Sequence, residues 1–529
     1  MRRLKVGILD LVTNEVPMRS AYGRVMNPNL SNIMPQMIAV WCEQAGHEVT
    51  FVCYTGVEDL LAELPTDLDV IFIGAFTQAA QLAYALSHIL RQRGIITALG
   101  GPHARCYPED ACRYFDYVLG LTDKGVIHDV LSECASHRPM GRAISAAQQP
   151  LELPSLQERW KFVEATLRKA PWIKIVPMIG SLGCPYTCSF CIDSTVDYQP
   201  LGFDQLREDL SFLLSKVRRP IVGWYDPNFG IRFDDYMEAI EAAAPVGQIR
   251  HLAESSLSLL SEPHLQRLKK NGFKAILPGI ESWFDMGDKS KTRQTGEDKL
   301  RQISDHVNLI LRYIPYVQAN FVLGLDSDEG PEPFELTKRF IDRCPGAFPG
   351  YSLNTAFGRA APLNLEYQRA SRVVPFPFHV INNNQSMNIR PKHYAWTEFY
   401  DRVVDLTAYS FSWRAIGRRF ASTRTQIPKW MNLLRGVSSE GFGRIRYHTG
   451  IRQMLDQEPS MRSFFEGDSV RLPDFYRDLI RRELGPIYPH LPDGALMHDP
   501  NAYLKSTLAN DGVPLPLRRE TVEPQLLGG

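Results

Sequence analysis

Three of the nine cysteines of this chain stand within eight residues, as Cys184, Cys188 and Cys191 in C-x3-C-x2-C spacing. They follow an apolar, β-branched run, Ile173 to Ile179, with a glycine at its end. This pattern predicts a strand that delivers a tight loop at its carboxyl end, which is where α/β barrels keep their chemistry. Thiolates this close in sequence favour a soft metal centre, and iron–sulfur clusters are normally held by cysteine thiolates.

The number of ligands distinguishes between metal sites. A structural zinc site takes a closed set of four ligands, and no histidine lies between His137 and His251 to complete one nearby. A [4Fe–4S] cluster held by three cysteines leaves one iron open to bind a small molecule. A zinc loop completed from a distant part of the chain and a set of three buried thiols remain as alternatives.

The spacing, with the aromatic Phe190 just before the third cysteine, closely resembles the signature of the radical S-adenosylmethionine (SAM) superfamily. The resemblance implies that Cys184, Cys188 and Cys191 ligate a [4Fe–4S] cluster. It also implies that the open iron chelates the amino and carboxylate groups of SAM, and that Phe190 lies near the adenine. Reductive cleavage of SAM would then yield methionine and a 5′-deoxyadenosyl radical, which abstracts hydrogen from an unactivated carbon.

Length and composition bound the remaining possibilities. A chain of 529 residues predicts two or three domains, and 44% hydrophobic with 22% charged residues is ordinary for a globular protein. A formal net charge of +0 argues against a bulk nucleic-acid binder. No apolar run approaches the ~20 residues of a membrane span, and the start of the chain reads as a strand, not a signal peptide. Scattered cysteines and an oxygen-sensitive cluster favour the cytoplasm.

Residues 1–140 alternate strand-like and helix-like segments, which predicts a Rossmann-like, doubly wound parallel sheet with ligands beyond the carboxyl ends of its strands. Strands are expected at Val6–Leu11, Glu48–Tyr54, Val70–Gly74, Ile95–Leu99 and Tyr117–Leu119, and helices at Asn32–Gly46 and Gln78–Arg93. Glycine-rich turns follow two of these strands and allow close approach of a ligand to the backbone.

The order of these pieces resembles the cobalamin-binding domain of the cobalamin-dependent radical SAM class. The resemblance implies a set of cobalamin-binding residues: Thr77, Gln78, Gly100, Gly101, Pro102, His103 and Gly120. Two departures stand against it. Asp10–Asn14 lacks the D-x-H-x-x-G motif, so no histidine is placed to ligate cobalt, and Gly120–Gly125 replaces an acidic glycine-rich turn. Some relatives keep this fold without cobalamin, and His103 also suits a satisfied loop histidine.

Residues 141–170 are expected to form a linker that ends in a helix, Leu156–Lys169, and residues 171–394 a partial (β/α)6 radical SAM barrel. After the strand before the cysteines, strands are expected at Ile221–Trp224, Ile249–Glu254, Ala275–Gly279, Ala319–Leu323 and Tyr351–Thr355, with a helix at Phe203–Val217. Six units make a barrel that is open enough to admit a large substrate.

Several expected strand ends resemble the SAM-binding positions of the superfamily. Glu281, in Gly279-Ile280-Glu281-Ser282, is the candidate for the ribose hydroxyls, and Asp226 for the methionine amine. Glu254 and Ser255 end the third strand, and Gly324 lies in an apolar segment that resembles the adenine-packing motif. Each polar residue among these also suits a helix cap or a solvent-facing loop.

Residues 395–512 are expected to form a helical C-terminal domain, and residues 513–529 a disordered tail. Residues 412–446 carry eight Lys and Arg against one acid, Glu440. This segment suits a solvated basic face, or a docking surface for an anionic substrate, a lipid headgroup or a membrane.

Three functions follow from these patterns. The first is a cobalamin-dependent methyltransferase that acts on an unactivated carbon of a small molecule or lipid, with an electron donor such as flavodoxin or ferredoxin. The second is a cobalamin-free radical SAM enzyme for carbon–carbon bond formation, cyclisation or oxidation. The third is a non-catalytic iron–sulfur or zinc protein that senses redox state. Substrate identity lies outside every motif.

Overall fold

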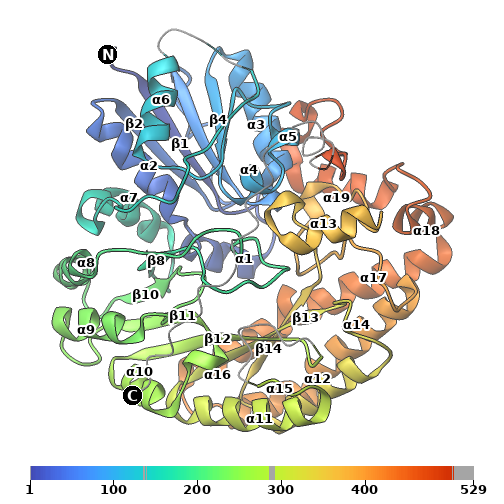
Figure 1. The fold of residues 1–529 in the computed structure, drawn as a ribbon. Coiled ribbons are helices and arrows are strands. Elements are labelled where there is room, and N and C mark those ends of the chain that lie inside the picture. The colour runs from blue at the N-terminus through green and yellow to red at the C-terminus, as the bar shows by residue number, and fades with distance from the viewer. Residues whose placement is uncertain (1, 135–137, 139, 285–291, 503, 505–529) are drawn as a thin grey trace.

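The computed structural model describes residues 2–134, 138, 140–284, 292–502 and 504. Two six-stranded sheets organise this part of the chain. In Figure 1 the blue N-terminal sheet stands above the green-to-yellow strands of the second sheet, and the orange and red helices run along one side. The carboxyl-terminal tail expected from residue 513 onward lies outside the described residues.

The first sheet is parallel throughout, in the order β2-β1-β3-β4-β5-β6. Its strands are β1 (Lys5–Leu11), β2 (Glu48–Tyr54), β3 (Val70–Ala75), β4 (Ile96–Gly100), β5 (Tyr117–Leu119) and β6 (Arg142–Ile144). Its helices are α1 (Ala21–Met26), α2 (Ile33–Gln44), α3 (Ala80–Gln92), α4 (Pro102–Cys106), α5 (Pro108–Ala111) and α6 (Lys124–Cys134). The doubly wound parallel sheet is confirmed. Of its strands only the short edge strand β6 was not foreseen, and helices α1, α4, α5 and α6 were not among those expected.

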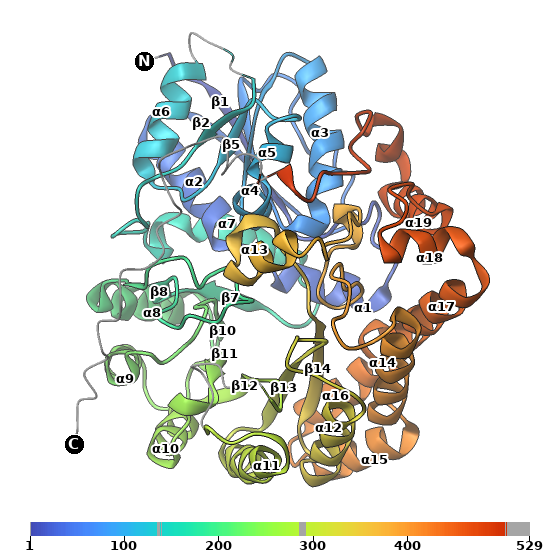
Figure 2. The same ribbon diagram turned by 45° about the vertical axis from the view of Figure 1, so that its right-hand side comes forward.

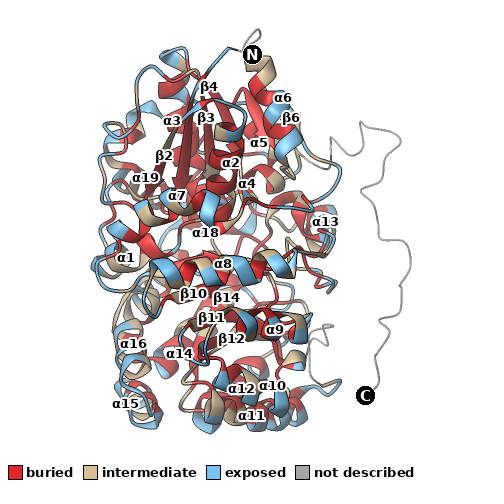
Figure 3. Cartoon of the chain, turned by 90° about the vertical axis from the view of Figure 1, so that its left-hand side faces the viewer, coloured by how far each residue is buried: buried red, intermediate tan, exposed pale blue. Residues whose placement is uncertain are grey.

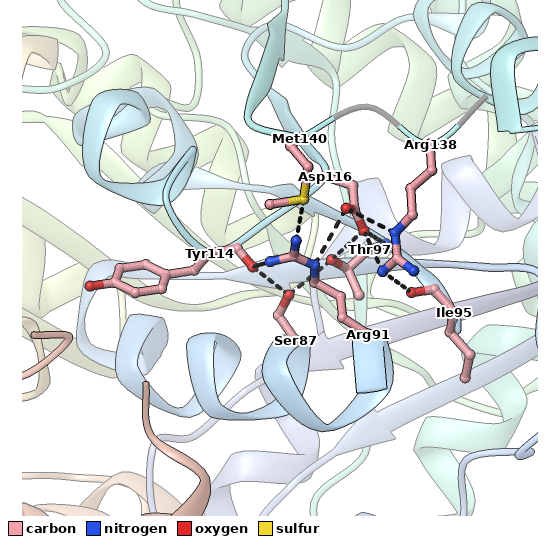
Figure 4. A network of polar contacts seen from close by, with 8 residues as sticks. All are labelled: Ser87, Arg91, Ile95, Thr97, Tyr114, Asp116, Arg138 and Met140. Carbon is pink, nitrogen blue, oxygen red and sulfur yellow. Dashed lines mark hydrogen bonds and ion pairs between the residues drawn. The ribbon is translucent and has the colours of Figure 1, made fainter. Parts of the chain in front are cut away.

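A buried carboxylate ties this sheet together away from its ligand-binding edge (Figure 4). Asp116, which is fully buried, accepts hydrogen bonds from the Thr97 backbone amide and from Arg138. Arg91 of α3 completes the cluster, with 3.4 Å between its Nε and the carboxylate. The network therefore fixes α3 and the segment after α6 to the sheet, a structural role.

The second sheet has the order β14-β13-β12-β11-β10-β7, so that β7 and β14 form its two edges. Its strands are β7 (Ile175–Met178), β10 (Ile221–Trp224), β11 (Arg250–Ser256), β12 (Phe273–Glu281), β13 (Tyr316–Leu323) and β14 (Phe348–Leu353). The helices are α7 (Leu156–Lys169), α8 (Phe203–Lys216), α9 (Phe233–Ala243), α10 (Glu262–Lys270), α11 (Gly296–Tyr313) and α12 (Glu332–Arg343). Figure 2 shows α8 to α12 along the outside of the curved sheet, and the partial barrel is confirmed.

The remaining chain is helical, as expected, and packs along the open side of the barrel. Its helices are α13 (Pro362–Arg369), α14 (Trp396–Ser410), α15 (Trp413–Ser422), α16 (Gln426–Val437), α17 (Arg444–Gln457), α18 (Pro459–Glu466) and α19 (Asp474–Leu484). The aromatic stripe of α14 is core, because Trp396, Phe399 and Tyr400 are buried. Among the described residues, none of the helices combines the length and the apolar character that crossing a bilayer requires.

Candidate active site

The three cysteines lie in a loop that a small hairpin closes after β7. Strand β8 (Ser181–Leu182) pairs antiparallel with β9 (Gln199–Pro200). Gly183 begins the loop with a left-handed φ of 66°, and a Cβ there would lie 2.2 Å from the Asp197 carbonyl oxygen. Only glycine allows this close return of the chain, so the glycine before the first cysteine fixes the shape of the loop.

Within the loop, Cys184 and Cys188 are buried and Cys191 is half-buried. The Asp193 backbone amide donates to the Cys191 sulfur over 3.4 Å, and such second-shell contacts orient thiolate ligands. Nowhere in the described chain do three His, Cys, Asp or Glu side chains gather as ligands of one metal ion. Three cysteines on one short loop are the ligand type that an iron–sulfur cluster takes, with each thiolate on a different iron.

The cysteine loop is also held from outside. Arg105 of α4 donates through Nη2 to the Ile192 carbonyl oxygen over 2.8 Å. On another side, the Leu363 amide of α13 donates to the Ser189 carbonyl oxygen over 2.9 Å. Sequence reasoning missed both contacts, because nothing in the local pattern of either segment indicates its distant partner.

Asp226, expected to hold the methionine amine, is buried and bound to the chain itself. Its carboxylate accepts from the Gly180 amide at 3.2 Å and from Ser181 Oγ at 2.7 Å, and Tyr236 donates to it as well. Burial raises the pKa of Asp226, although these donors oppose the shift. The structure thus places this carboxylate between the end of β10 and the start of the cysteine loop, where it positions the loop.

Glu281 ends β12 with a left-handed φ of 65°. Such a conformation is uncommon for a residue with a side chain, and it costs conformational energy that is often stored at functional sites. A register shift interrupts the pairing of β12 with β13 at this point. The backbone therefore departs from regular strand geometry where the ribose-binding carboxylate was expected.

A neighbouring carboxylate, Asp328, links the ends of β12 and β13. It accepts from Ser282 Oγ at 2.8 Å and from the Gly324 amide at 3.2 Å. Gly324 has a φ of 83°, and a Cβ there would lie 2.9 Å from the Phe399 ring. Sequence reasoning selected Gly324 and missed Asp328, two positions beyond Asp326 in the same loop.

The two other SAM candidates on β11 lie on different sides of the strand. Glu254 faces a cavity, whereas Ser255 is buried and donates through Oγ to the Phe229 carbonyl oxygen over 2.9 Å. Phe190 is half-buried in the cysteine loop. The structure therefore brings Glu254 to open space, and the Ser255 side chain ties β11 to the loop after β10.

One large cavity, of about 1580 Å³, lies between the carboxyl edge of the first sheet and the interior of the barrel. Segments from all three parts of the chain line it: Val12–Glu15 and Gln78 from the first sheet, Tyr225, Leu252, Glu254, Leu277 and Gln318 from the barrel, and Met431, Arg435 and Arg444 from the C-terminal helices. Small-molecule sites usually occupy about 300–1,000 Å³, so this cavity has room for more than one ligand.

The residues expected to bind cobalamin follow β3, β4 and β5 along one edge, but only Gln78 reaches the cavity wall. Thr77 is buried, and Gly100 has open space where a Cβ would project. Gly101 has a φ of 92°, and a Cβ on it would lie 2.9 Å from the Ala75 carbonyl oxygen. Pro102 starts α4, and a Cβ on Gly120 would lie 2.7 Å from Ser145 Oγ.

His103 turns into the core of the first domain. Its Nε2 lies 2.7 Å from the Tyr84 hydroxyl, which donates its own proton to Asp110 over 2.8 Å. The hydroxyl therefore accepts from Nε2, and burial lowers the pKa of His103 to about 3, which keeps the ring neutral. This placement matches a core histidine, although its Nδ1 has no hydrogen-bond partner among the described residues, and the side chain does not line the cavity.

After β1, Val12 stands at the histidine position of the D-x-H spacing that starts at Asp10, and two residues later comes Asn14. It lines the cavity, and its Nδ2 lies 3.2 Å from Nε2 of His379, a buried residue that sequence reasoning missed. The polar wall formed by Thr13, Asn14 and Gln78, the open face at Gly100 and the volume of the cavity fit a large corrinoid at this edge. Cobalt would receive no ligand from His103.

No family model matches the chain. Bacteriochlorophyllide d C-12(1)-methyltransferase of Chlorobaculum tepidum is 26% identical over 301 residues, which are 55% of this chain and 64% of that protein. Hopanoid C-2 methylase of Rhodopseudomonas palustris is 25% identical over 326 residues, 58% of each chain. The alignments therefore cover less than two thirds of either relative.

Solved structures extend the likeness to the fold. TsrM of Kitasatospora setae, a radical S-adenosylmethionine methyltransferase with cobalamin and a [4Fe–4S] cluster bound, has a TM-score of 0.52 and 13% identity over 70% of this chain and 76% of that chain. OxsB, a cobalamin-dependent S-adenosylmethionine radical enzyme with aqua-cobalamin bound, has a TM-score of 0.51 and 12% identity over 94% of this chain and 85% of that chain. This chain has the fold of the cobalamin-dependent radical SAM class. The fold that the sequence resemblance implied is thereby confirmed.

Proposed function

We propose that this protein is a radical SAM enzyme that transfers a methyl group to an unactivated carbon of a small molecule or lipid with the help of cobalamin. The observation that carries the proposal is the single cavity that joins the carboxyl edge of the first sheet to the interior of the barrel. A corrinoid at the sheet edge and a substrate inside the barrel would share this space. The curated relatives are methyltransferases, which supports the same reaction.

When bound, the cluster and cobalamin supply the radical and methyl-transfer chemistry, and the protein supplies orientation and exclusion of water. Cys184, Cys188 and Cys191 would hold the cluster, in a loop that Asp226 and Arg105 keep in place. Phe190, Glu254, Ser255, Glu281 and Gly324 would surround SAM. Thr77, Gln78, Gly100, Gly101, Pro102 and Gly120 would meet the corrinoid through backbone and small side chains, and His103 would support the turn from the core.

A second candidate keeps the radical chemistry without cobalamin and forms a carbon–carbon bond, closes a ring or oxidises the substrate. It is favoured by the absence of a histidine from Asp10–Asn14 after β1 and by the inward orientation of His103. A non-catalytic redox sensor explains less, because it has no need of a cavity of about 1580 Å³ that reaches into the barrel.

The proposed partners follow from the reaction and from the surface. A low-potential donor such as flavodoxin or ferredoxin would supply the electron, and the cytoplasm would provide the reducing compartment that the cluster needs. The outward-facing cations of segment 412–446 are proposed to contact a membrane surface, as the source of a lipid-like substrate.

The products of SAM distinguish the two enzymatic candidates. Anaerobically reconstituted protein, supplied with reductant, hydroxocobalamin and SAM, should release S-adenosylhomocysteine and 5′-deoxyadenosine in similar amounts when substrate is present. The Cys188→Ala variant serves as the control and should release no 5′-deoxyadenosine. If the wild type makes 5′-deoxyadenosine alone and retains no corrin spectrum after desalting, the cobalamin-free candidate replaces the first.

A further inference from the structure

Large apolar side chains are exposed together on the α15–α16 pair and on the segment before β7. Trp172 is 80% exposed, Ile427 68% and Trp430 53%, and Trp413 and Leu434 are also exposed. Trp430 packs edge-on against Phe420 with 5.3 Å between ring centroids, so that it joins α16 to α15. Single exposed apolar residues are ordinary, but a group of this kind marks an interaction surface.

Two members of this group lie at the large cavity, and Trp413, Trp430 and Leu434 lie beside it on α15 and α16. Trp172 and Ile427 both line that cavity, together with Pro428 and Met431. Figure 3 shows α1, α16 and α15 along the same side of the molecule, with exposed residues on the outer faces of α15 and α16. The apolar rim is therefore continuous with the interior space in which the substrate is proposed to bind.

The mouth of this cavity also carries positive charge. Lys174, Arg218, Arg219, Arg250 and Lys274 stand at the amino ends of β7, β10, β11 and β12, and all five line the cavity. Within the described ranges, no carboxylate lies within the 4.0 Å of an ion pair to any of these five cations. A chain whose formal net charge is +0 thus concentrates unpaired cations at this opening.

The basic segment 412–446 divides into an inner and an outer part. Arg419 is buried and donates to the Ala347 and Ser410 carbonyl oxygens, and Arg435 pairs with Glu440. Arg444 donates to the Tyr351 carbonyl oxygen over 2.7 Å. These three side chains serve the interior, so the segment as a whole is not a docking face. Its outward cations lie beside the exposed aromatic residues: Arg414 on α15, Arg424 in the connection between α15 and α16, and Lys429 on α16.

We infer that this mouth, defined by Trp172, Lys174, Arg218, Lys274 and Ile427 and flanked by Trp430 on α16, rests on an anionic phospholipid bilayer from which an amphiphilic substrate enters the cavity. Tryptophan prefers the interface between headgroups and acyl chains, and clustered Lys and Arg are attracted to anionic lipids. The bilayer explains why apolar and cationic residues surround an opening, which an acidic protein partner would close. The entry of substrate rests on the proposed function, but the docking does not.

Co-sedimentation with vesicles tests the docking directly. Full-length wild-type protein should bind vesicles of phosphatidylcholine mixed with phosphatidylglycerol, bind phosphatidylcholine alone weakly, and lose binding at high salt. The double variant Trp172→Ala/Trp430→Ala should bind the mixed vesicles about tenfold more weakly, because it loses both interfacial anchors. Lys174→Glu/Lys274→Glu should lose the preference for the anionic lipid.

Two controls separate these effects from misfolding. Val470→Ala removes a side chain that is 76% exposed, and Arg93→Glu reverses an exposed charge at the end of α3. Neither position lines the cavity, so both controls should bind mixed vesicles as the wild type does. Circular dichroism should be the same for all variants.

Equal binding by the wild type and both mouth variants would overturn the inference, as would no binding to anionic vesicles. Self-association that the tryptophan changes abolish would assign the surface to a second copy of the chain instead. SAM cleavage without added lipid reports on the proposed function alone. SAM cleavage without vesicle binding would contradict only the docking. Vesicle binding without SAM cleavage would contradict only the enzymatic proposal.

Discussion

Arg105 of α4 and Asp193 of the cysteine loop form an ion pair of 3.3 Å that joins the first domain to the cluster loop. The same guanidinium donates to the Ile192 carbonyl oxygen over 2.8 Å. Helix α4 begins directly after the Gly100-Gly101 turn, which is where a corrinoid is expected to lie. A ligand that shifts this turn would therefore also shift a residue that holds the cysteine loop.

Replacing Arg105 should loosen the cluster loop. Arg105→Ala removes both contacts, and since both partners are partly exposed, the loss should cost about 1 kcal/mol. We expect the variant to retain less iron after desalting and to lose its absorbance faster on exposure to air. Arg113→Ala is the control, because Arg113 pairs with Asp110 inside the first domain and has no contact with the loop. Equal iron retention in all three proteins would contradict a positioning role for Arg105.

The three cysteines should be needed for the cluster individually. Anaerobic protein should carry about four iron and four sulfide, and Cys184→Ala, Cys188→Ala or Cys191→Ala should each abolish the absorbance near ~400 nm. Cys344→Ala removes a buried thiol that hydrogen-bonds to the Ser304 carbonyl oxygen, far along the chain, and should leave the iron content unchanged. Stoichiometric zinc without iron in the wild type would defeat this prediction.

The sequence predicted both sheets because each depends on local pattern. Buried parallel strands are short continuous apolar runs, and glycines and helix caps mark where they end. Val70–Gly74 and Ile221–Trp224 were therefore placed to within a residue. Strand β6 was missed because Arg142–Ile144 is short, exposed along much of its length and carries no such run.

The site was predictable only where a motif is local. The cysteine spacing and the strand-end elements are contiguous, so the sequence alone indicates them. Arg105, Asp328 and His379 act through partners that lie distant in the chain or in the fold, and their sequence surroundings carry no signal of this. The inward turn of Arg419, Arg435 and Arg444 was equally hidden, because a run of basic residues looks the same whether it faces solvent or a carbonyl-lined interior.

Acid should destabilise this fold through four buried histidines. Burial lowers the pKa of His103, His251, His448 and His498 to about 3, whereas an unfolded histidine titrates near ~6.5. Between about pH 6.5 and pH 3 each of these histidines is protonated in the unfolded chain but neutral in the folded chain. The free energy of unfolding should therefore fall by about 1.4 kcal/mol per pH unit for each histidine as the pH is lowered through this range.

His251→Phe provides the check on this slope. The ring of His251 stacks on Phe273 at 4.7 Å between centroids, so phenylalanine can replace it at the cost of the hydrogen bond from Trp224. Urea unfolding between about pH 6 and pH 4 should show that the free energy of unfolding falls less steeply with decreasing pH in the variant. The difference in slope should correspond to the uptake of one proton fewer on unfolding. A slope identical to that of the wild type would show that His251 takes up a proton in the folded state.

Glu281 combines a strained backbone with a proposed ligand contact, and two substitutions separate these roles. Glu281→Ala should weaken SAM binding by roughly 1–3 kcal/mol, the range for losing a hydrogen bond to a charged group, with unchanged cluster content. Glu281→Gly should bind SAM as weakly as the alanine variant. It should also unfold at higher temperature than that variant, because glycine adopts a φ of 65° without strain.

Calorimetric SAM titration and thermal unfolding of the three cluster-loaded proteins give both quantities. If the carboxylate holds the ribose, affinity falls equally in the two variants while their stabilities differ. If the carboxylate serves only the end of β12, both variants lose stability through that contact and keep the affinity of the wild type. An alanine variant that binds SAM normally would therefore remove Glu281 from the SAM site and leave the left-handed turn as its role.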